Sequence, residues 1–253
     1  MSNFLKIWKG IIQNPFDGFA QVNKDTKIAL PLLCLLLLVL ISTAMLLPLM
    51  MSNEYITALG RVQMEQMRQK GVELSDEQAA SIKKSLAAPA MKIVTIVSTF
   101  GGGLGGYVGI LLLVTLLMKV LTLIIKSSVS YKLLFKILVF AGIVGIVQRL
   151  LKSGITLAGD WSSALRRVQT TEDLKLVLQS SVSLTLLFSY KSLGKVGYYL
   201  LDTISDIFNW IYYIFLYAGL KRAAGLDKNK ALIITIISAG VFVAAGAVFV
   251  IVI

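Results

Sequence analysis

Residues 93–118 read IVTIVSTFGGGLGGYVGILLLVTLLM, a run of 26 residues without a charged side chain. A helix needs about 20 predominantly apolar residues to cross a hydrocarbon core about 30 Å thick, so this run is long enough to span a membrane. Beyond the single charge of Lys119, apolar sequence continues to Ile125. The stretch therefore predicts a transmembrane helix and indicates an all-α integral membrane protein.

Four other stretches complete the predicted bundle. Residues 28–53, which contain CLLLLVLIS, and residues 231–253 are also uncharged. Residues 133–151 carry Lys136 and Arg149 near their ends, where long cationic side chains can extend to the membrane interface. The fifth stretch is rich in aromatic residues and carries Asp206 near its start. We predict a polytopic all-α bundle of five transmembrane helices, at about 28–51, 97–125, 133–151, 203–220 and 231–253.

The distribution of basic residues predicts how this bundle is oriented. With a cytoplasmic N-terminus, the inner segments 1–27, 119–136 and 221–230 hold 12 Lys and Arg in 55 residues, against 13 in 95 for residues 52–92 and 149–202. Because cytoplasmic segments are enriched in Lys and Arg, we expect the N-terminus inside and the C-terminus outside. The expected domains are a cytoplasmic amphipathic segment, 1–27, and a membrane domain, 28–253, with outer loops at 52–92 and 152–202.

The composition excludes several kinds of site. The chain has 57% hydrophobic and 15% charged residues and a mean hydropathy of +0.81, too apolar for one soluble domain of 253 residues. It contains no histidine and one cysteine, which excludes a Cys/His zinc site, a Ser/His triad and an intramolecular disulfide. The net charge is +12, and the basic residues lie in clusters beside apolar stretches. This arrangement indicates that they contact lipid headgroups rather than nucleic acid. We predict no catalytic residue, cofactor or metal.

Three segments outside the predicted spans have sequence patterns that predict their structure. FLKIWKGII, residues 4–12, places Phe4, Leu5, Trp8, Ile11 and Ile12 on one helix side, which predicts a helix in the cytoplasmic interface that ends at Asn14-Pro15. In the first outer loop, the capping box Ser75-Asp-Glu-Gln78 predicts a helix from Asp76 to about Leu86, after a charged helix that stops at Gly71. Residues 176–190 are uncharged but too short and polar to span, so we expect an interfacial or re-entrant segment.

Small residues in two predicted spans form the first candidate site. The pairs Gly101/Gly105, Gly102/Gly106 and Gly105/Gly109 are overlapping GxxxG motifs, which remove side chains so that another helix can approach closely. The alternatives are a hinge or break in this span, or a phosphate loop, and the latter would need a preceding strand and a following Lys-Ser/Thr. Gly240 and Ala244 make a second small-residue surface. We expect both to serve helix packing.

Two acids form the second candidate site. Asp202 and Asp206 are four residues apart, which places them on one face if their helix is continuous. In one interpretation they anchor the outer end of the helix, by capping it or by pairing with Lys191, Lys195 or Arg149. In the other, they form a cation or proton site. Lys119 lies too far from the outer side to pair with Asp206, so we expect it to extend to the cytoplasmic surface. The aromatic residues near Trp161 and Trp210 are expected to be interface anchors rather than ligand cages.

The order of several segments resembles the Yip (Ypt-interacting protein) domain family, in its bacterial branch, over nearly the whole chain. They are Asn14-Pro15-Phe16 before the first span, MEQMRQKGVELSDEQ at 64–78, the glycine-rich span with the turn Lys126–Lys132, and the final motifs Asp206-Ile-Phe-Asn-Trp210, Ala218-Gly219-Leu220-Lys221 and Lys228-Asn-Lys230-Ala231. The resemblance implies five membrane helices and a cytoplasmic N-terminus. A small GTPase partner is not implied, because the Asp-Leu-Tyr-Gly-Pro signature of eukaryotic members is missing.

These observations lead to one expected function and one alternative. The resemblance implies a non-enzymatic multi-pass scaffold or accessory protein of the bacterial cytoplasmic membrane, with no catalytic residue. Its partners would be the lipid bilayer and other membrane proteins, such as an ABC-type exporter, or a second copy of itself. A transporter or channel subunit is the alternative, although the sequence has no internal repeat and little charge at mid-membrane.

Overall fold

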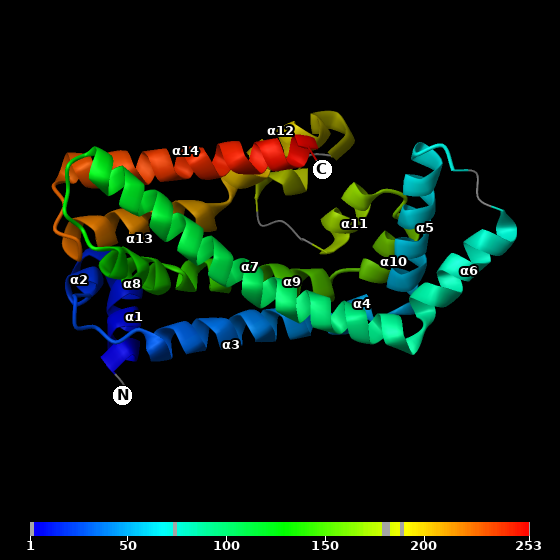
Figure 1. Cartoon of the computed structure of the whole chain (residues 1–253), viewed down its shortest axis with the longest axis horizontal. Coiled ribbons are helices and arrows are strands. Elements are labelled where there is room, and N and C mark those ends of the chain that lie inside the picture. The colour runs from blue at the N-terminus through cyan, green and yellow to red at the C-terminus, as the bar shows by residue number, and fades with distance from the viewer. Residues whose placement is uncertain (1–2, 73–74, 179–182, 188–189, 253) are drawn as a thin grey trace. The chain divides into compact units, whose positions relative to one another are not determined.

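The computed structural model describes residues 3–72, 75–178, 183–187 and 190–252, and all regular elements within these ranges are helices (Figure 1). The first half of the chain forms α1 (Asn3–Gln13), α2 (Pro15–Ala20), α3 (Ala29–Met45), α4 (Leu47–Met50), α5 (Asn53–Gln69), α6 (Asp76–Ala87) and α7 (Pro89–Ile124). The second half forms α8 (Tyr131–Ala141), α9 (Ile143–Ala158), α10 (Trp161–Arg167), α11 (Thr171–Leu178), the 3-10 turn η1 (Leu184–Leu187), α12 (Tyr190–Ser205), α13 (Ile207–Arg222) and α14 (Lys228–Val252).

Three helices within the described residues are long and apolar enough to cross a membrane. They are Pro89–Ile124, the consecutive helices of Tyr131–Ala158, and Lys228–Val248. Ala29–Met45 is apolar but shorter. The expectation of an all-helical chain with long apolar helices is confirmed.

The chain divides into two compact units. Unit 1 comprises residues 1–38, 106–148 and 181–253, and unit 2 comprises residues 39–105 and 149–180. In unit 1, α2 packs on α1 and α13, and α13 also packs on α8 and α14. Its fully buried side chains include Ile11, Phe19, Leu134, Phe140 and Leu216. This unit therefore has an apolar core to which the N-terminal helices contribute.

Part of the predicted apolar face of α1 contributes to this core. Of the predicted apolar face, Trp8 and Ile11 are buried, together with Ile7, whereas Leu5 is 41% and Ile12 63% exposed. The Trp8 ring meets Phe140 edge to face at 6.1 Å between centroids. The helix ends before Asn14 as predicted, because Asn14 caps α2 through its side chain. Two of the five predicted apolar-face residues, Trp8 and Ile11, thus pack in the protein core, whereas Leu5 and Ile12 stay exposed.

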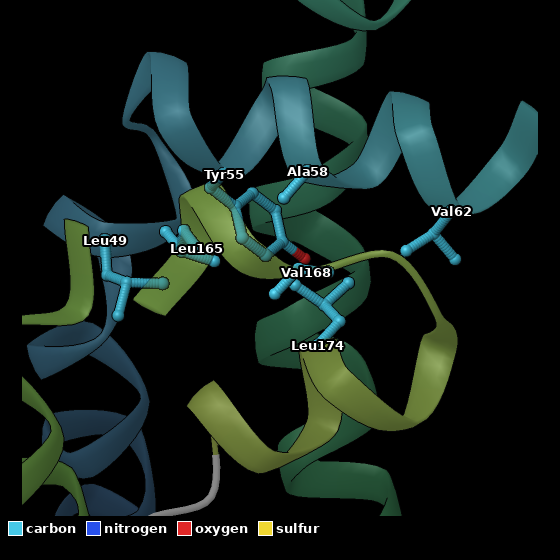
Figure 2. Close-up of a cluster of buried hydrophobic side chains, with 7 residues drawn as sticks. All are labelled: Leu49, Tyr55, Ala58, Val62, Leu165, Val168 and Leu174. Atoms are coloured by element: carbon cyan, nitrogen blue, oxygen red, sulfur yellow. The ribbon is translucent and has the colours of Figure 1, made fainter. Parts of the chain in front are cut away.

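Unit 2 contains the helices predicted for the first outer loop. The capping box of α6 is present, with Ser75 and Gln78 making both reciprocal bonds, and Gly71 follows α5 with a φ of +78°. A cluster of buried residues joins α4, α5, α10 and α11 (Figure 2). Its members are Leu49, Tyr55, Ala58, Val62, Leu165, Val168 and Leu174. The two predicted outer loops therefore share one small apolar core.

The region of the expected interfacial or re-entrant segment is described only in part. Within 176–190, α11 ends at Leu178 and η1 covers Leu184–Leu187. Residues 179–182 and 188–189 lie outside the described residues.

Candidate functional site

Asp206 lies at the junction of α12 and α13 in unit 1. Its backbone is extended, with φ −74° and ψ 112°, and its Oδ1 accepts a hydrogen bond from the Phe208 N–H at 3.0 Å. The Gln148 Nε2 of α9 donates to the Asp206 Oδ2 at 2.6 Å. The residue is 1% exposed, so both interactions are shielded from solvent. Asp206 therefore caps α13 and ties this helix end to α9.

Asp202 lies one turn earlier and has a separate set of partners. Ser183 Oγ donates to the Asp202 Oδ1 at 2.7 Å, and Thr185 Oγ1 donates to the same oxygen at 3.3 Å. Both hydroxyl residues are buried, and their oxygens are 2.7 Å apart. The Ser205 Oγ accepts from the Leu184 N–H at 3.0 Å. These bonds fasten the η1 segment to α12, which puts the Asp202 carboxylate among neutral donors.

Asp202 and Asp206 lie on either side of a helix break, although the Asp206 N–H still donates to the Asp202 O at 3.1 Å as in a continuous helix. The chain leaves helical geometry at Asp206, because this residue caps a new helix. Gln148 donates to Asp206, whereas the Arg149 Nη2 donates to the Thr43 Oγ1 at 3.0 Å in unit 2. The side chain of Lys191 lies outside the described residues. A cation or proton role for Asp202 and Asp206 stays a prediction.

Two lysines of the apolar helices donate to backbone carbonyl oxygens. Lys119 Nζ donates to the Val129 O at 2.8 Å, beyond the C-terminal end of α7, which is the direction expected for its side chain. Lys136 is 1% exposed, and its Nζ donates to the Asn23 O at 3.2 Å and to the Lys24 O at 2.5 Å. Its burial was not predicted, because the sequence does not show that the 21–28 loop covers this position.

The predicted glycine surface of α7 has open space beside it. A Cβ added to Gly101, Gly102, Gly105, Gly106 or Gly109 meets no described atom within 4 Å. On the helix segment that follows, Leu112, Leu113 and Leu116 are exposed, whereas Leu111, Val114 and Met118 on the other side are buried. No break occurs at these glycines, since α7 is one helix from Pro89 to Ile124. Their role in helix packing stays a prediction.

In the second small-residue surface, which also includes Gly246, a side chain of another helix approaches Gly246 rather than Gly240. A Cβ on Gly240 would meet nothing within 4 Å, and Ala244 is exposed. At Gly246, however, a Cβ would lie 1.7 Å from the Tyr199 Oη. The missing side chain thus admits the Tyr199 ring of α12 rather than a helix backbone. A run of small residues indicates that another part of the protein packs closely against the helix, but it does not show which small residue makes the contact.

Chemically, these arrangements hold helices together through hydrogen bonds. Within the described residues, no three His, Cys, Asp or Glu side chains gather as a metal site would require. An all-helical chain with several long apolar helices is a multi-pass membrane protein. The model of the Yip1 domain matches residues 9–251, and the chain belongs to this family, whose members are generally non-catalytic. No curated protein and no solved structure matches the chain significantly.

Proposed function

We propose that the chain is a non-enzymatic scaffold or accessory protein of a bacterial cytoplasmic membrane, which holds other membrane proteins together. The observation that supports it most is the family match over residues 9–251. The hydrogen bonds made by Asp202, Asp206 and Lys136 agree with it, since these polar groups support the fold. An exporter of the ABC type or a second copy of the chain is the proposed partner.

The proposal includes five transmembrane helices, with the N-terminus in the cytoplasm and the C-terminus outside. The three long helices supply three of them. For the remaining two we propose α3 with α4, and α13 together with the end of α12, because α3 has 17 residues and α13 has 16, about 24–26 Å each. The density of basic residues on the inner segments supports the orientation.

For partner binding we propose the glycine face of α7, defined by Gly101, Gly102, Gly105, Gly106 and Gly109. Open space beside these glycines is the observation that supports it, since a helix of another chain could approach the α7 backbone closely there. No described atom lies within 4 Å of a Cβ added at any of these glycines.

The test is photo-crosslinking in native membranes, combined with substitution of this face. A photoreactive residue at Gly102 should capture a membrane protein, whereas the same residue at Ile236, which is 60% exposed on α14, should not. Gly105→Leu should remove the crosslinked product without lowering the unfolding temperature, and Leu113→Ile should leave both unchanged. Equal crosslinking from Gly102 and Ile236 would contradict a scaffold that binds through this face.

A transporter or channel subunit is the second candidate, and the buried carboxylate of Asp206 favours it. Ionisable groups at membrane depth often line ion or proton pathways. In liposomes that contain the purified chain alone, the scaffold proposal expects no ion or solute flux. A flux that Asp206→Asn abolishes, in protein that still unfolds cooperatively at the same temperature, would replace the scaffold by the transporter.

A further inference from the structure

One end of unit 1 concentrates basic side chains. The α2 helix with its following loop, the turn between α7 and α8, and the turn between α13 and α14 meet there (Figure 1). Contacts join several of these segments to one another and to α1. The α2 helix packs on α1 and on α13, where the Phe16 ring meets the Tyr217 ring edge to face and lies 5.6 Å from the Lys221 Nζ, and α13 packs on α8. We call this surface the basic end, defined by Lys6, Lys9, Lys24, Lys27, Lys126, Lys132, Lys221, Arg222, Lys228 and Lys230.

The positive charge of the basic end is only partly balanced. Its segments, 1–27, 126–132 and 221–230, hold ten basic residues and three acids, Asp17, Asp25 and Asp227. Asp17 accepts a hydrogen bond from the Asn14 Nδ2 at 2.6 Å, and Asp227 pairs with Lys230 at 3.7 Å. Most of the basic side chains are exposed. The surface therefore presents a net positive charge to whatever lies beside it.

The loop at 21–28 is fixed in a shape that presents Lys24 and Lys27 outward. The Asn23 Oδ1 accepts from the Asp25 and Thr26 N–H groups at 2.9 and 3.0 Å, which forms a local turn. From beneath, the buried Lys136 Nζ donates to the Asn23 and Lys24 carbonyl oxygens. Lys24 and Lys27 are exposed. The exposed lysines are thus held in place before any ligand binds, with a further cation under the loop.

Apolar side chains accompany this charge on α1. Leu5 and Ile12 lie on one side of the helix next to Lys9, and all three are exposed, while Ile7, Trp8 and Ile11 are buried in the protein. Exposed apolar side chains beside lysines are typical of helices in the headgroup layer, where the apolar groups reach the acyl chains and the lysines reach the phosphates. The outer face of α1 therefore fits the membrane interface.

From these observations we infer that the basic end binds anionic phospholipid headgroups of the leaflet that surrounds it. The apolar helices α7, α8 and α14 start or stop at this end, so headgroups are the nearest anions. Nine of the ten side chains are lysines, whose compact charges suit phosphates of varied orientation better than the two-pronged recognition typical of arginine. This inference concerns lipid and holds whether the chain is a scaffold or a transporter.

The experiment measures which lipid associates with the reconstituted full chain. In vesicles of equal parts phosphatidylcholine and phosphatidylglycerol, spin-labelled phosphatidylglycerol should be immobilised by the protein several-fold more than spin-labelled phosphatidylcholine, and added salt should reduce this ratio. Lys24→Glu combined with Lys27→Glu should lower the ratio about twofold or more, because the double change replaces two positive charges beside the headgroups by two negative ones.

A matched control separates this surface from total charge. Lys83→Glu combined with Lys84→Glu makes the same change in net charge on exposed positions of α6, and it should leave the lipid ratio unchanged. An unfolding temperature equal to that of the unmodified chain shows that both double variants fold. A ratio of one in the unmodified chain would overturn the inference and would favour an acidic protein segment as the ligand of the basic end. Equal reductions in both double variants would also overturn it.

Discussion

Gly219 lies so close to Ile137 that a Cβ on the glycine would be 2.4 Å from the Ile137 Cγ2. The same Cβ would be 3.2 Å from the Phe19 ring. Gly219 belongs to α13, Ile137 to α8 and Phe19 to α2, and all three are buried. The glycine therefore marks the place where the N-terminal helices and two helices of the apolar bundle meet most closely.

Gly219→Ala should destabilise unit 1, because the β-branched Ile137 has little freedom to move away from the added methyl group. Overpacking of this kind costs about 1–3 kcal/mol, so we expect a lower unfolding temperature in detergent and faster proteolysis near α1 and α2. Gly109→Ala is the control, since its Cβ meets nothing within 4 Å. Equal unfolding temperatures of the two variants would show that the close packing at Gly219 does not affect the free energy of unfolding.

Lys136→Met should loosen the loop at 21–28. The substitution keeps an apolar stem but removes the bonds from Nζ to the Asn23 and Lys24 carbonyl oxygens, of which the Asn23 oxygen keeps its bond from the Thr26 N–H at 3.3 Å. A hydrogen bond from a charged donor contributes about 1.5–3 kcal/mol, so the loop loses part of what holds it. Amide hydrogen exchange over residues 21–28 should therefore accelerate. Lys132→Met, on an exposed lysine of the same helix, should leave this exchange rate unchanged. Slow exchange in the Lys136 variant would mean that other contacts fix the loop.

The sequence predicted where helices begin and end better than it predicted which side chains contact one another. The helix at Asp76–Ala87, the stop at Gly71 and the end of α1 before Asn14 follow from capping and turn residues, which act within a few positions. The burial of Lys136 and the bond between Gln148 and Asp206 depend on segments more than 50 residues apart, which composition and periodicity do not report. The same holds for Gly219, which the sequence presented only as part of a family motif.

Arg61→Met should weaken the small apolar core of unit 2. The Arg61 Nη2 donates to the Leu165 O at 2.6 Å and so ties α5 to α10 across the cluster of Figure 2. Loss of the donor leaves this carbonyl oxygen with the bond from the Val168 N–H at 3.3 Å and removes a hydrogen bond from a charged group, which contributes about 1.5–3 kcal/mol. Limited proteolysis between residues 159 and 170 should become faster. Arg68→Met removes an exposed arginine from the same helix and should have no such effect.

Asp160 should make the stability of α10 depend on pH. Hydrogen bonds from Ser163, and the nearby charges of Arg166 and Arg167, lower the pKa of its carboxyl below the ordinary value of 3.8. A lowered pKa in the folded state means that the stabilisation is present above about pH 4 and is lost as the pH falls through the folded value. Asp160→Ala should therefore lower the unfolding temperature more at pH 7 than at acidic pH, where the carboxyl becomes protonated. An equal difference at both pH values would assign the effect to something other than the carboxylate charge.

Cysteine labelling from outside the cell tests the proposed orientation. In a Cys34→Ala background, Glu77→Cys on α6 and Asn229→Cys at the start of α14 each place one thiol on an exposed position. If the N-terminus is cytoplasmic and five helices cross the membrane, an impermeant maleimide should label position 77 in intact cells. Position 229 should react only after the membrane is opened, which also shows that its thiol is accessible. Labelling of 229 with protection of 77 would invert the topology, and labelling of both in intact cells would mean an even number of crossings between them.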